Sequence, residues 1–134
     1  MKQNYSFQTI RLALTAEALA WLARTTVNDR KEVISHFTIL NDFLRAMRTD
    51  AGADGTFRRP IEISAGMAQY AEIELGQRHG FGRTRMRNII SKMEELGLLE
   101  VDKSTIGSVA ALTAVTGWQV GGDERTRNPY YTAD

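Results

Sequence analysis

Residues 80–101 combine a helical pattern of apolar positions with a glycine stop and a strand-like end. Apolar side chains recur there at intervals of three and four positions, which places them on one side of an α-helix. Gly97 follows where a left-handed helix cap is expected, and Leu98, Leu99 and Val101 favour a strand. The pattern therefore predicts a helix with one buried side, followed by a strand. The apolar positions of the helix are Met86, Ile89, Ile90, Met93 and Leu96.

A broader apolar stripe between residues 29 and 47 predicts the main core helix. Asp29 is interpreted as its N-cap, and Glu32, three positions later, as the second member of a capping box. Burial of each large member of the stripe is expected to contribute about 1.5–3 kcal/mol. A shorter helix is predicted from residue 15, with Trp21 as a packing residue. The stripe consists of Val33, Ile34, Phe37, Leu40, Phe43, Leu44 and Met47.

The segment between this helix and residue 76 predicts a loop, a short strand and another helix. Residues 49–55 are polar and rich in turn-forming residues, which predicts a loop. Residues 59–63 alternate around Ile61 and Ile63, so a strand is expected, with Pro60 at its start or at a sheet edge.

A helix is predicted over residues 67–75, with Ser64 as its candidate cap. After residue 97, the β-branched and apolar segments 98–102 and 109–120 predict two strands that form a hairpin. The connection between them begins at Lys103. The residues expected to break the helix over 67–75 are Gly76, Gly80 and Gly82.

The two ends of the chain are less regular. Residues 2–14 fit either a short strand or the start of a helix, and both alternatives stay open. Residues 121–134 contain two glycines, mixed charges and an Asn-Pro pair, which indicates a polar C-terminal tail. The predicted organisation is one domain over residues 1–120, with an N-terminal helical extension, followed by the tail.

The charge of the chain is unevenly distributed, although the formal net charge is only +1. Residues 78–92 carry five of the 17 basic residues and none of the 16 acidic ones, which leaves 12 basic against 16 acidic residues elsewhere. A basic surface next to an apolar helical stripe indicates an anionic partner bound on one side. The five basic residues are Arg78, Arg83, Arg85, Arg87 and Lys92.

The composition excludes several classes of protein and of site. A chain of 134 residues with 43% hydrophobic residues can form a single core. The absence of cysteine excludes disulfides, thiolate metal sites and a cysteine nucleophile. The pattern predicts neither a signal peptide nor a membrane span, and the cytoplasm is the expected location.

The predicted order is helix, strand, helix, glycine turn, basic helix, strand, short loop and strand. This order resembles the winged helix-turn-helix family of DNA-binding domains, and the resemblance covers about residues 29–120. In that family the recognition helix begins with a pattern like Gly-Val-Ser-Arg-Ser-Thr-Val and ends in a Leu-Glu-Glu-Leu-Gly-Leu-Ile type of segment. Here residues 80–86 read Gly-Phe-Gly-Arg-Thr-Arg-Met, and residues 92–99 read Lys-Met-Glu-Glu-Leu-Gly-Leu-Leu.

The chain departs from the family pattern at two places. The stretch from residue 64 to residue 80 is several residues longer than the usual first helix and turn, which predicts an inserted loop at residues 76–79. Gly82 stands where the family usually has a capping Ser or Thr, and glycine is a weaker cap.

The resemblance implies a fold that is mainly α with a small antiparallel β-sheet, and a function in binding double-stranded DNA. The protein would be a transcriptional regulator of bacterial type, or a replication or mobile-element accessory factor. The helix start would approach phosphate through its free N–H groups, and the helix would enter the major groove. The residues implied to contact DNA are Arg78, Arg83, Thr84, Arg85, Arg87, Asn88, Lys92 and Lys103.

The implied contacts fall into two groups. Arg85, Asn88 and Arg87 are candidates for base edges, because Arg bridges two acceptors on guanine and Asn pairs with adenine. The side chains expected at phosphate, which set affinity and register without reading sequence, are Arg78, Lys92 and Lys103.

Other functions are weighed against DNA binding. A basic helix face is often merely solvated, and winged helices also serve as protein-docking modules. The docking alternative predicts exposed apolar residues such as Phe81 and Ile106. A homodimer is also a hypothesis, since three aromatic residues exceed what one small core needs. These are Trp21, Phe37 and Phe43.

An enzyme is not expected, and neither a cofactor nor a metal is predicted. Asp50 and Asp54 resemble a fragment of a calcium loop whose other ligands are absent. His36 is interpreted as structural and His79 as a loop residue near phosphate. Arg58 and Arg59 are expected to belong to a solvated loop. A second basic contact with DNA by these two residues is the less favoured alternative. The DNA target, the direction of regulation and any effector are not predicted.

Overall fold

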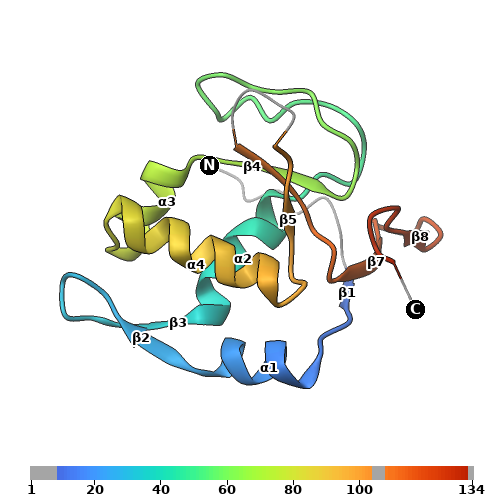
Figure 1. Ribbon diagram of the computed structural model, residues 1–134. Helices are drawn as coiled ribbons and strands as arrows, with labels where there is room; N and C mark the ends of the chain where they lie inside the picture. The colour runs from blue at the N-terminus through green and yellow to red at the C-terminus, as the bar shows by residue number, and fades with distance from the viewer. Residues whose placement is uncertain (1–8, 104–107, 133–134) are drawn as a thin grey trace.

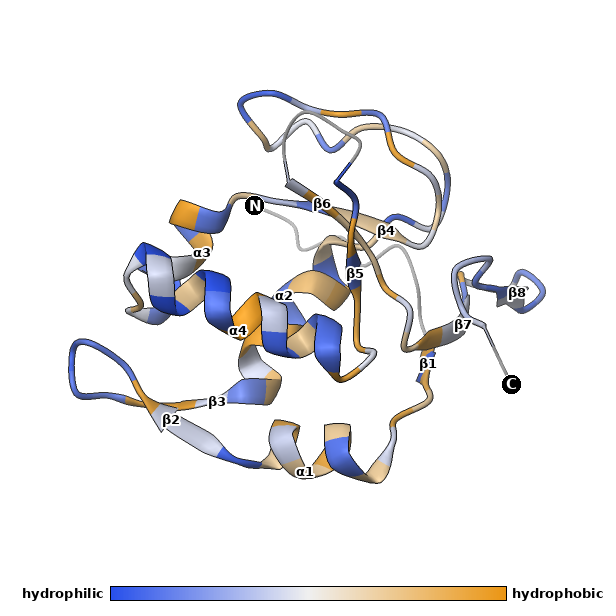
Figure 2. Cartoon of the chain, in the orientation of Figure 1, coloured by the Kyte–Doolittle hydropathy of each residue, from blue (hydrophilic) through white to orange (hydrophobic). Residues whose placement is uncertain are grey.

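The protein is described by a computed structural model that covers residues 9–103 and 108–132. Within these ranges the fold is mixed α and β, with four helices and small antiparallel sheets. The β2–β3 hairpin and the segment over residues 48–62 project from different sides of the molecule (Figure 1). In Figure 2 the turn of that hairpin is coloured hydrophilic throughout. The helices are α1 (Ala16–Ala23), α2 (His36–Ala46), α3 (Glu72–His79) and α4 (Arg83–Glu95).

One sheet consists of the three strands that precede and follow the helices α3 and α4 in the chain. It has the order β4-β6-β5, and both neighbouring pairs are antiparallel. The register pairs Met67 with Ala111 and Glu100 with the same Ala111, so β6 is the central strand. The predicted hairpin between residues 98–102 and the following strand is confirmed for β5 and β6. The strands are β4 (Met67–Tyr70), β5 (Glu100–Val101) and β6 (Ser108–Ala111).

A second sheet and a separate hairpin complete the described strands. The second sheet has the order β1-β7-β8, and β1 and β7 pair antiparallel with an irregularity between Arg11 and Leu12. The hairpin consists of β2 and β3, in which Val27 pairs with Val33. The bounds are β1 (Thr9–Leu12), β2 (Thr25–Val27), β3 (Val33–Ser35), β7 (Val115–Gln119) and β8 (Thr126–Arg127).

One buried cluster joins all four helices to both three-stranded sheets. Side chains of α2 form its centre, because Ile39, Leu40 and Phe43 are almost fully buried. The helix α4 contributes Met86 and Met93, which have no exposed surface. The periodicity that predicted one buried side for this helix is therefore confirmed. Burial of this side fixes which residues of α4 face outward.

The helix α4 ends just before Gly97, as the sequence predicted. Gly97 has φ 75°, a left-handed conformation that suits glycine. Its N–H donates to Glu94 O (3.0 Å), and the Leu98 N–H donates to Met93 O (2.9 Å). These two hydrogen bonds form a Schellman motif, which satisfies carbonyls at the helix end and turns the chain toward β5.

The helix predicted over residues 29–47 is wrong at its start. The helix α2 begins at His36 and is capped by Ser35, whose hydroxyl accepts from the Phe37 N–H (3.2 Å). Residues 28–32 instead form the turn between β2 and β3. The side chain of Asn28 accepts from the N–H groups of Arg30 (2.9 Å) and Glu32 (2.8 Å). Such local side-chain bonds give the backbone an alternative to the helix, and here they prevail.

The strand predicted over residues 59–63 is also wrong, and so is the helix over residues 67–75 at its start. In the described part of the chain, residues 59–63 form only an isolated bridge between Ile63 and Gly52. The strand is β4, which pairs with β6. Three consecutive residues of β4 are buried, so the alternation that marks a half-buried strand is missing from the sequence.

The inserted loop predicted at residues 76–79 is wrong, since these residues belong to α3. The extra length before residue 80 is taken up by β4 instead. Gly76 does not break the helix. It is buried, and a Cβ atom at this position would lie 2.7 Å from Phe81 O. The glycine therefore permits the chain to fold back closely after α3.

The two ends of the chain are more ordered than predicted. The open alternatives for residues 2–14 resolve into strand β1 for Thr9–Leu12, and residues 1–8 lie outside the described part. The single strand predicted over residues 109–120 is wrong, because these residues contribute to two strands, β6 and β7, of different sheets. In the predicted tail, β8 pairs with β7, and Asn128 is fully buried with hydrogen bonds to Leu112 O and Val115 O.

Candidate nucleic-acid interface

The outward side of α4 carries a row of uncharged polar side chains that ends at the exposed Glu95. Thr84, Asn88 and Ser91 are exposed, and their spacing of four and three residues places them on one side of the helix, opposite Met86 and Met93. None of the three forms a side-chain hydrogen bond with any residue in the ranges 9–103 and 108–132. Their hydroxyl and amide groups are therefore available to a partner.

Arginines lie at the two edges of this row. Arg85 is directed to the β2–β3 hairpin, where its guanidinium donates to Asp29 Oδ1 (3.0 Å) and Thr26 Oγ1 (3.3 Å). It also lies over the Phe81 ring, 4.8 Å from the centroid. On the other edge, Arg87 donates to Glu72 Oε1 (3.1 Å) of α3. Both arginines predicted for base edges are thus engaged within the chain.

Arg83 differs from these two arginines. It lies at the first position of α4, is exposed, and has no ion pair or side-chain hydrogen bond with a described residue. Its position beside the helix N-terminus favours an anion, because the first N–H groups of a helix lack intrahelical partners. Arg83 is therefore the cation of α4 whose charge is not matched by a described acidic neighbour.

The three residues predicted for phosphate all form ion pairs, which are exposed except at the carboxylates of Asp42 and Glu94. Lys92 pairs with Glu95 (3.2 Å), and Lys103 with Glu94 (3.7 Å). Arg78 is not on α4 but in the last turn of α3, where it pairs with Asp42 (3.1 Å) and Glu74 (3.3 Å). Exposed pairs of this kind contribute about 0–1 kcal/mol, so an anionic partner could replace the carboxylates at low cost. Residues 104–107 of the expected wing lie outside the described residues.

The turn over residues 80–82, which joins α3 to α4, is held by the β2–β3 hairpin. Gly80 has φ 81°, a conformation that favours glycine. Its carbonyl accepts from the Asp29 N–H (2.9 Å), and His79 O accepts from Asn28 Nδ2 (2.8 Å). Asn28 is only 3% exposed, although it lies in a turn. The hairpin therefore fixes the position from which α4 starts.

Asp29 binds the backbone and a side chain at the start of α4. Gly82 is the N-cap of the helix and has no side chain, but its N–H donates to Asp29 Oδ2 (2.9 Å). Hydrogen bonds from Arg85 and from Gly82 hold the pKa of Asp29 below its usual value of 3.8. The capping-box pattern predicted Asp29 at the start of the core helix α2, whereas Asp29 binds the start of α4. Its real role was not detectable, since it depends on a partner 53 residues away.

The tip of the same hairpin carries Lys31 in an unusual conformation. Among described residues other than glycine, Lys31 alone has a positive φ, at 66°. A left-handed conformation costs a residue with a Cβ atom about 1–2 kcal/mol. Backbone strain of this kind concentrates at functional sites. Lys31 forms no ion pair with a described residue, whereas the neighbouring Arg30 pairs with Glu32 (3.2 Å) beside the turn that precedes α4.

The two histidines are both buried, and the interpretation of His79 as a loop residue is wrong. His79 lies in α3 and is 5% exposed, with Nε2 2.6 Å from Asp42 Oδ2. Burial tends to raise the pKa of Asp42, but hydrogen bonds and charge from His79 and Arg78 hold it below its usual value. His36 stacks on Trp21 at 3.9 Å, with Nδ1 2.7 Å from Trp21 O.

The apolar positions expected at a protein-docking surface are only partly exposed. Phe81 is 5% exposed, so its assignment as a surface residue is wrong, and Ile106 lies outside the described residues. Of the aromatic residues assigned to a dimer face, Trp21 and Phe43 are buried in the core, whereas Phe37 is 45% exposed. The large aromatic content is therefore mostly accounted for by the core.

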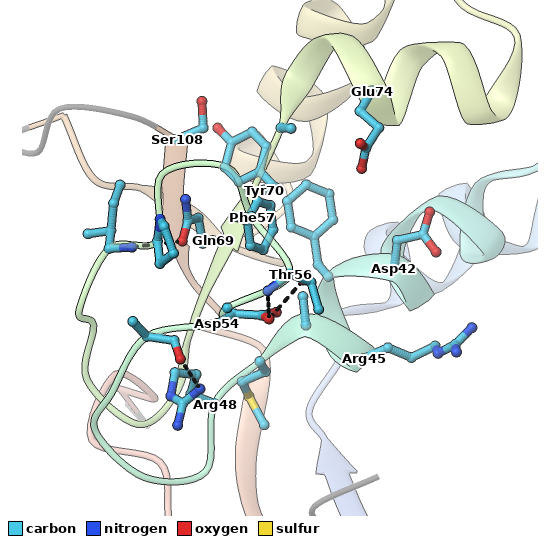
Figure 3. Close-up of a pocket in the computed structure, with 18 of the residues that line it drawn as sticks. Asp42, Arg45, Arg48, Asp54, Thr56, Phe57, Gln69, Tyr70, Glu74 and Ser108 are labelled. Carbon is cyan, nitrogen blue, oxygen red and sulfur yellow. Dashed lines mark hydrogen bonds between the residues drawn. The ribbon is translucent and has the colours of Figure 1, made fainter. Parts of the chain in front are cut away.

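The structure also has a cavity of about 1660 Å³ (Figure 3). It is bordered by α2, α3, β4 and the segment over residues 48–62. Phe57 and Tyr70 both line it, and Asp54 accepts hydrogen bonds from Thr56 (Figure 3). Arg58 and Arg59 also line it. The sequence did not reveal this cavity, because residues 49–55 carry a pattern typical of any polar loop.

Comparisons of the chain with protein-family models, with curated proteins and with solved structures give no match. No helix in the described part of the chain has the length and apolar character needed to cross a membrane. Within residues 9–103 and 108–132, no three His, Asp or Glu side chains are grouped so that they could hold a metal ion.

Proposed function

We propose that this protein is a winged helix-turn-helix protein that binds double-stranded DNA through the outward side of α4. It would act as a transcriptional regulator, or as an accessory factor in replication or in a mobile element. The proposal is for a binding protein without catalytic activity. The chemistry of the α4 surface and the order of the surrounding elements support it.

The order of elements is the first support. It runs α2, β4, α3, the turn over residues 80–82, α4, β5 and β6. This is the helix, strand, helix, turn, helix, strand, strand order of the winged helix-turn-helix family. The strands before and after the helix pair form one sheet, with β4 beside β6. A fold-level similarity does not by itself establish a function, so the surface of α4 carries the argument.

The single observation that carries the proposal is the unoccupied polar row on α4. A major groove of B-DNA is wide enough for a helix, and base edges present hydrogen-bond donors and acceptors. Asn88 is at the centre of the row, and its amide can pair with both the donor and the acceptor of adenine. Thr84 can reach bases or phosphate, and Arg83 lies at the helix start for phosphate. A merely solvated helix face would not require a hairpin that fixes its start.

The hairpin extends the same surface beyond the helix. Its turn is bound to the α3–α4 turn, so a duplex that approaches Arg83 also approaches Lys31 and Arg30. Lysine and arginine at this place would neutralise phosphates that flank the contacted base pairs. Arg85 then has a positioning role, because its pair with Asp29 connects the hairpin to α4.

Selection of bound fragments from random double-stranded DNA, followed by titration of the selected duplex, tests the proposal. Asn88→Ala should weaken binding by about 1–3 kcal/mol and relax the preference at one base pair. Lys92→Ala should weaken binding to all duplexes alike and reduce the salt slope by about one. Arg125→Ala, which removes an exposed cation outside this surface, serves as the matched control.

The results also separate the proposal from its alternative. If no duplex is enriched, and if neither Asn88→Ala nor Lys92→Ala alters binding at low salt, DNA binding by α4 is refuted. The winged-helix protein-docking module then becomes the preferred function. It would be recognised by a stable protein complex that forms without nucleic acid.

A further inference from the structure

The segment over residues 48–62 forms one wall of the cavity and contains no helix or strand. Segments of this length without secondary structure are uncommon in compact domains, and those that are ordered are usually functional. The cavity volume of about 1660 Å³ exceeds the roughly 300–1,000 Å³ of typical small-molecule sites. Space is therefore sufficient for a ligand of ordinary metabolite size, with room left for water.

Hydrogen bonds hold this wall at both of its ends. At the start, Arg48 donates to Asp50 O (3.0 Å), Asp50 Oδ1 (3.1 Å) and Ala53 O (3.2 Å). At the far end, Gln69 of β4 donates to Arg59 O (2.9 Å) and accepts from the Ile61 N–H (3.1 Å). The side chain of Gln69 is buried, so both of its polar groups are used to hold the segment. The wall is thus a built feature of the fold.

The side of the cavity next to the core is aromatic. Phe43 of α2 and Tyr70 of β4 meet edge to face, with ring centroids 5.1 Å apart. Phe57, from the segment over residues 48–62, also lines the cavity (Figure 3). Burial raises the pKa of Tyr70 to about 12, so the phenol is neutral at physiological pH. These rings offer a surface for a flat apolar group.

Several of the charged side chains that line the cavity belong to internal ion pairs. Arg48 pairs with Asp50, and Arg78 pairs with Asp42 and Glu74. The remaining acidic side chain, Asp54, accepts two hydrogen bonds from Thr56.

Arg58 and Arg59 remain without such a partner. Neither forms an ion pair or a side-chain hydrogen bond with any residue that the structure describes. Both belong to the cavity wall that also carries Phe57. Two guanidinium groups next to Phe57 are therefore available to an anionic ligand.

We propose that this cavity binds a small anionic molecule with a flat apolar body, of the class of aromatic carboxylates. The apolar body packs against Phe57 and Tyr70. The carboxylate accepts hydrogen bonds from Arg58 or Arg59, whose planar guanidinium matches two carboxylate oxygens. A neutral or cationic molecule of the same shape lacks this interaction.

The position of the cavity also indicates a regulatory use, which rests on the proposed function. Its lining includes Leu75 and Arg78 of α3 and Ser108 at the start of β6. The helix α3 packs against α4. The strand β6 follows the segment that was expected to form the wing. A ligand bound there contacts the parts that orient the DNA-binding surface. Binding of the ligand itself does not depend on that function.

The test uses the full chain without DNA and a series of molecules with matched shape. Benzoate, benzamide and benzamidine differ in charge, and acetate carries the charge without the ring. Binding is followed by chemical-shift changes in two-dimensional NMR spectra. Benzoate is expected to bind with a dissociation constant of about 1 mM, and each of the other three about tenfold more weakly. Shifts should concentrate at residues 54–61 and Tyr70.

Two variants examine the predicted contacts. The double variant Arg58→Gln, Arg59→Gln should reduce benzoate affinity about tenfold without altering the weak binding of benzamide. Arg125→Gln removes an exposed cation elsewhere and should have no effect. Equal binding of benzoate, benzamide and benzamidine, or equal binding of benzoate and acetate, would overturn the proposal. An unaltered affinity of the double variant would do so as well. None of these outcomes bears on DNA binding, which is measured separately.

Discussion

Replacement of Gly76 by alanine tests the packing that presents α4. Gly76 lies in the middle of α3, where alanine is the better helix former by about 1 kcal/mol. In the structure, however, an added Cβ atom would lie 2.7 Å from Phe81 O and 3.5 Å from the Cβ atom of Met86. The same stretch is fixed by the Phe81 N–H, which donates to Gly76 O (2.8 Å). The two considerations predict opposite signs for the effect on stability.

The size of the destabilisation depends on the atom that the added Cβ atom would approach, which is the backbone oxygen of Phe81. A backbone carbonyl cannot rotate away as a flexible side chain can, so α3 or the turn over residues 80–82 must shift. Overpacking of this kind costs about 1–3 kcal/mol, and the backbone contact places Gly76 at the upper end. After the gain of about 1 kcal/mol from helix propensity, a net loss of about 1–2 kcal/mol is expected. This is a sizeable part of the roughly 5–15 kcal/mol that stabilises a domain.

Urea unfolding of the wild type and of Gly76→Ala measures this loss. Gln77→Ala, an exposed position of the same helix, controls for helix propensity and should have a small effect. Gly55→Ala controls for loss of a glycine at a site with no atom within 4 Å of the added Cβ atom. A Gly76→Ala variant more stable than the wild type would refute the reasoning, because the close approach of Phe81 O to α3 could not then exist.

Two further predictions concern charge. Lys31→Gly should raise the free energy of unfolding by about 0.5–1 kcal/mol, because glycine accepts the positive φ with less strain. The same change should reduce the slope of log K for DNA binding against log salt concentration by about 0.9, because one cation is removed. Urea unfolding and DNA titrations at several salt concentrations check both, and unchanged DNA binding would exclude a phosphate contact. Because the pKa of Asp42 is lowered in the folded state, the folded state binds fewer protons than the unfolded state. The stabilisation that the Asp42 carboxylate provides is therefore fully present above the unfolded-state pKa of about 3.8. It is lost as the pH falls through the folded-state pKa. Unfolding measured between pH 7 and pH 2 should therefore show a steeper loss of stability below pH 4 for the wild type than for Asp42→Asn, and parallel curves would contradict this.

The helix α4 and its glycine stop could be predicted because their determinants are local. The buried stripe through Met86, Ile90 and Met93 repeats over about two turns, and the chain leaves the helix at Gly97, whose N–H and that of Leu98 bind carbonyls of the last turn. The hairpin of β5 and β6 follows at short range. In each case the residues that decide the structure lie within a few positions of one another.

The errors occur where distant partners decide. Residues 67–70 have no alternating pattern, and they form β4 because β6, about 40 positions later, pairs with them. Residues 28–32 satisfy the pattern of a capping box, yet Asn28 is buried against His79 O, which favours the hairpin turn. Neither partner is visible in a window of the size used to detect a helix.

The candidate site divides in the same way. The sequence by itself determined that α4 has a buried side and an outward side with Thr84, Asn88 and Ser91, because helical spacing alone assigns residues to sides. Only the tertiary structure decided which cations on that surface are engaged, since Asp29 and Glu72 come to it from other elements. It alone also brought the hairpin to the start of α4 and enclosed the cavity beneath residues 48–62. The physical reason is that periodicity acts within one helix, whereas ion pairs, caps and cavities depend on contacts between segments that are far apart in the chain.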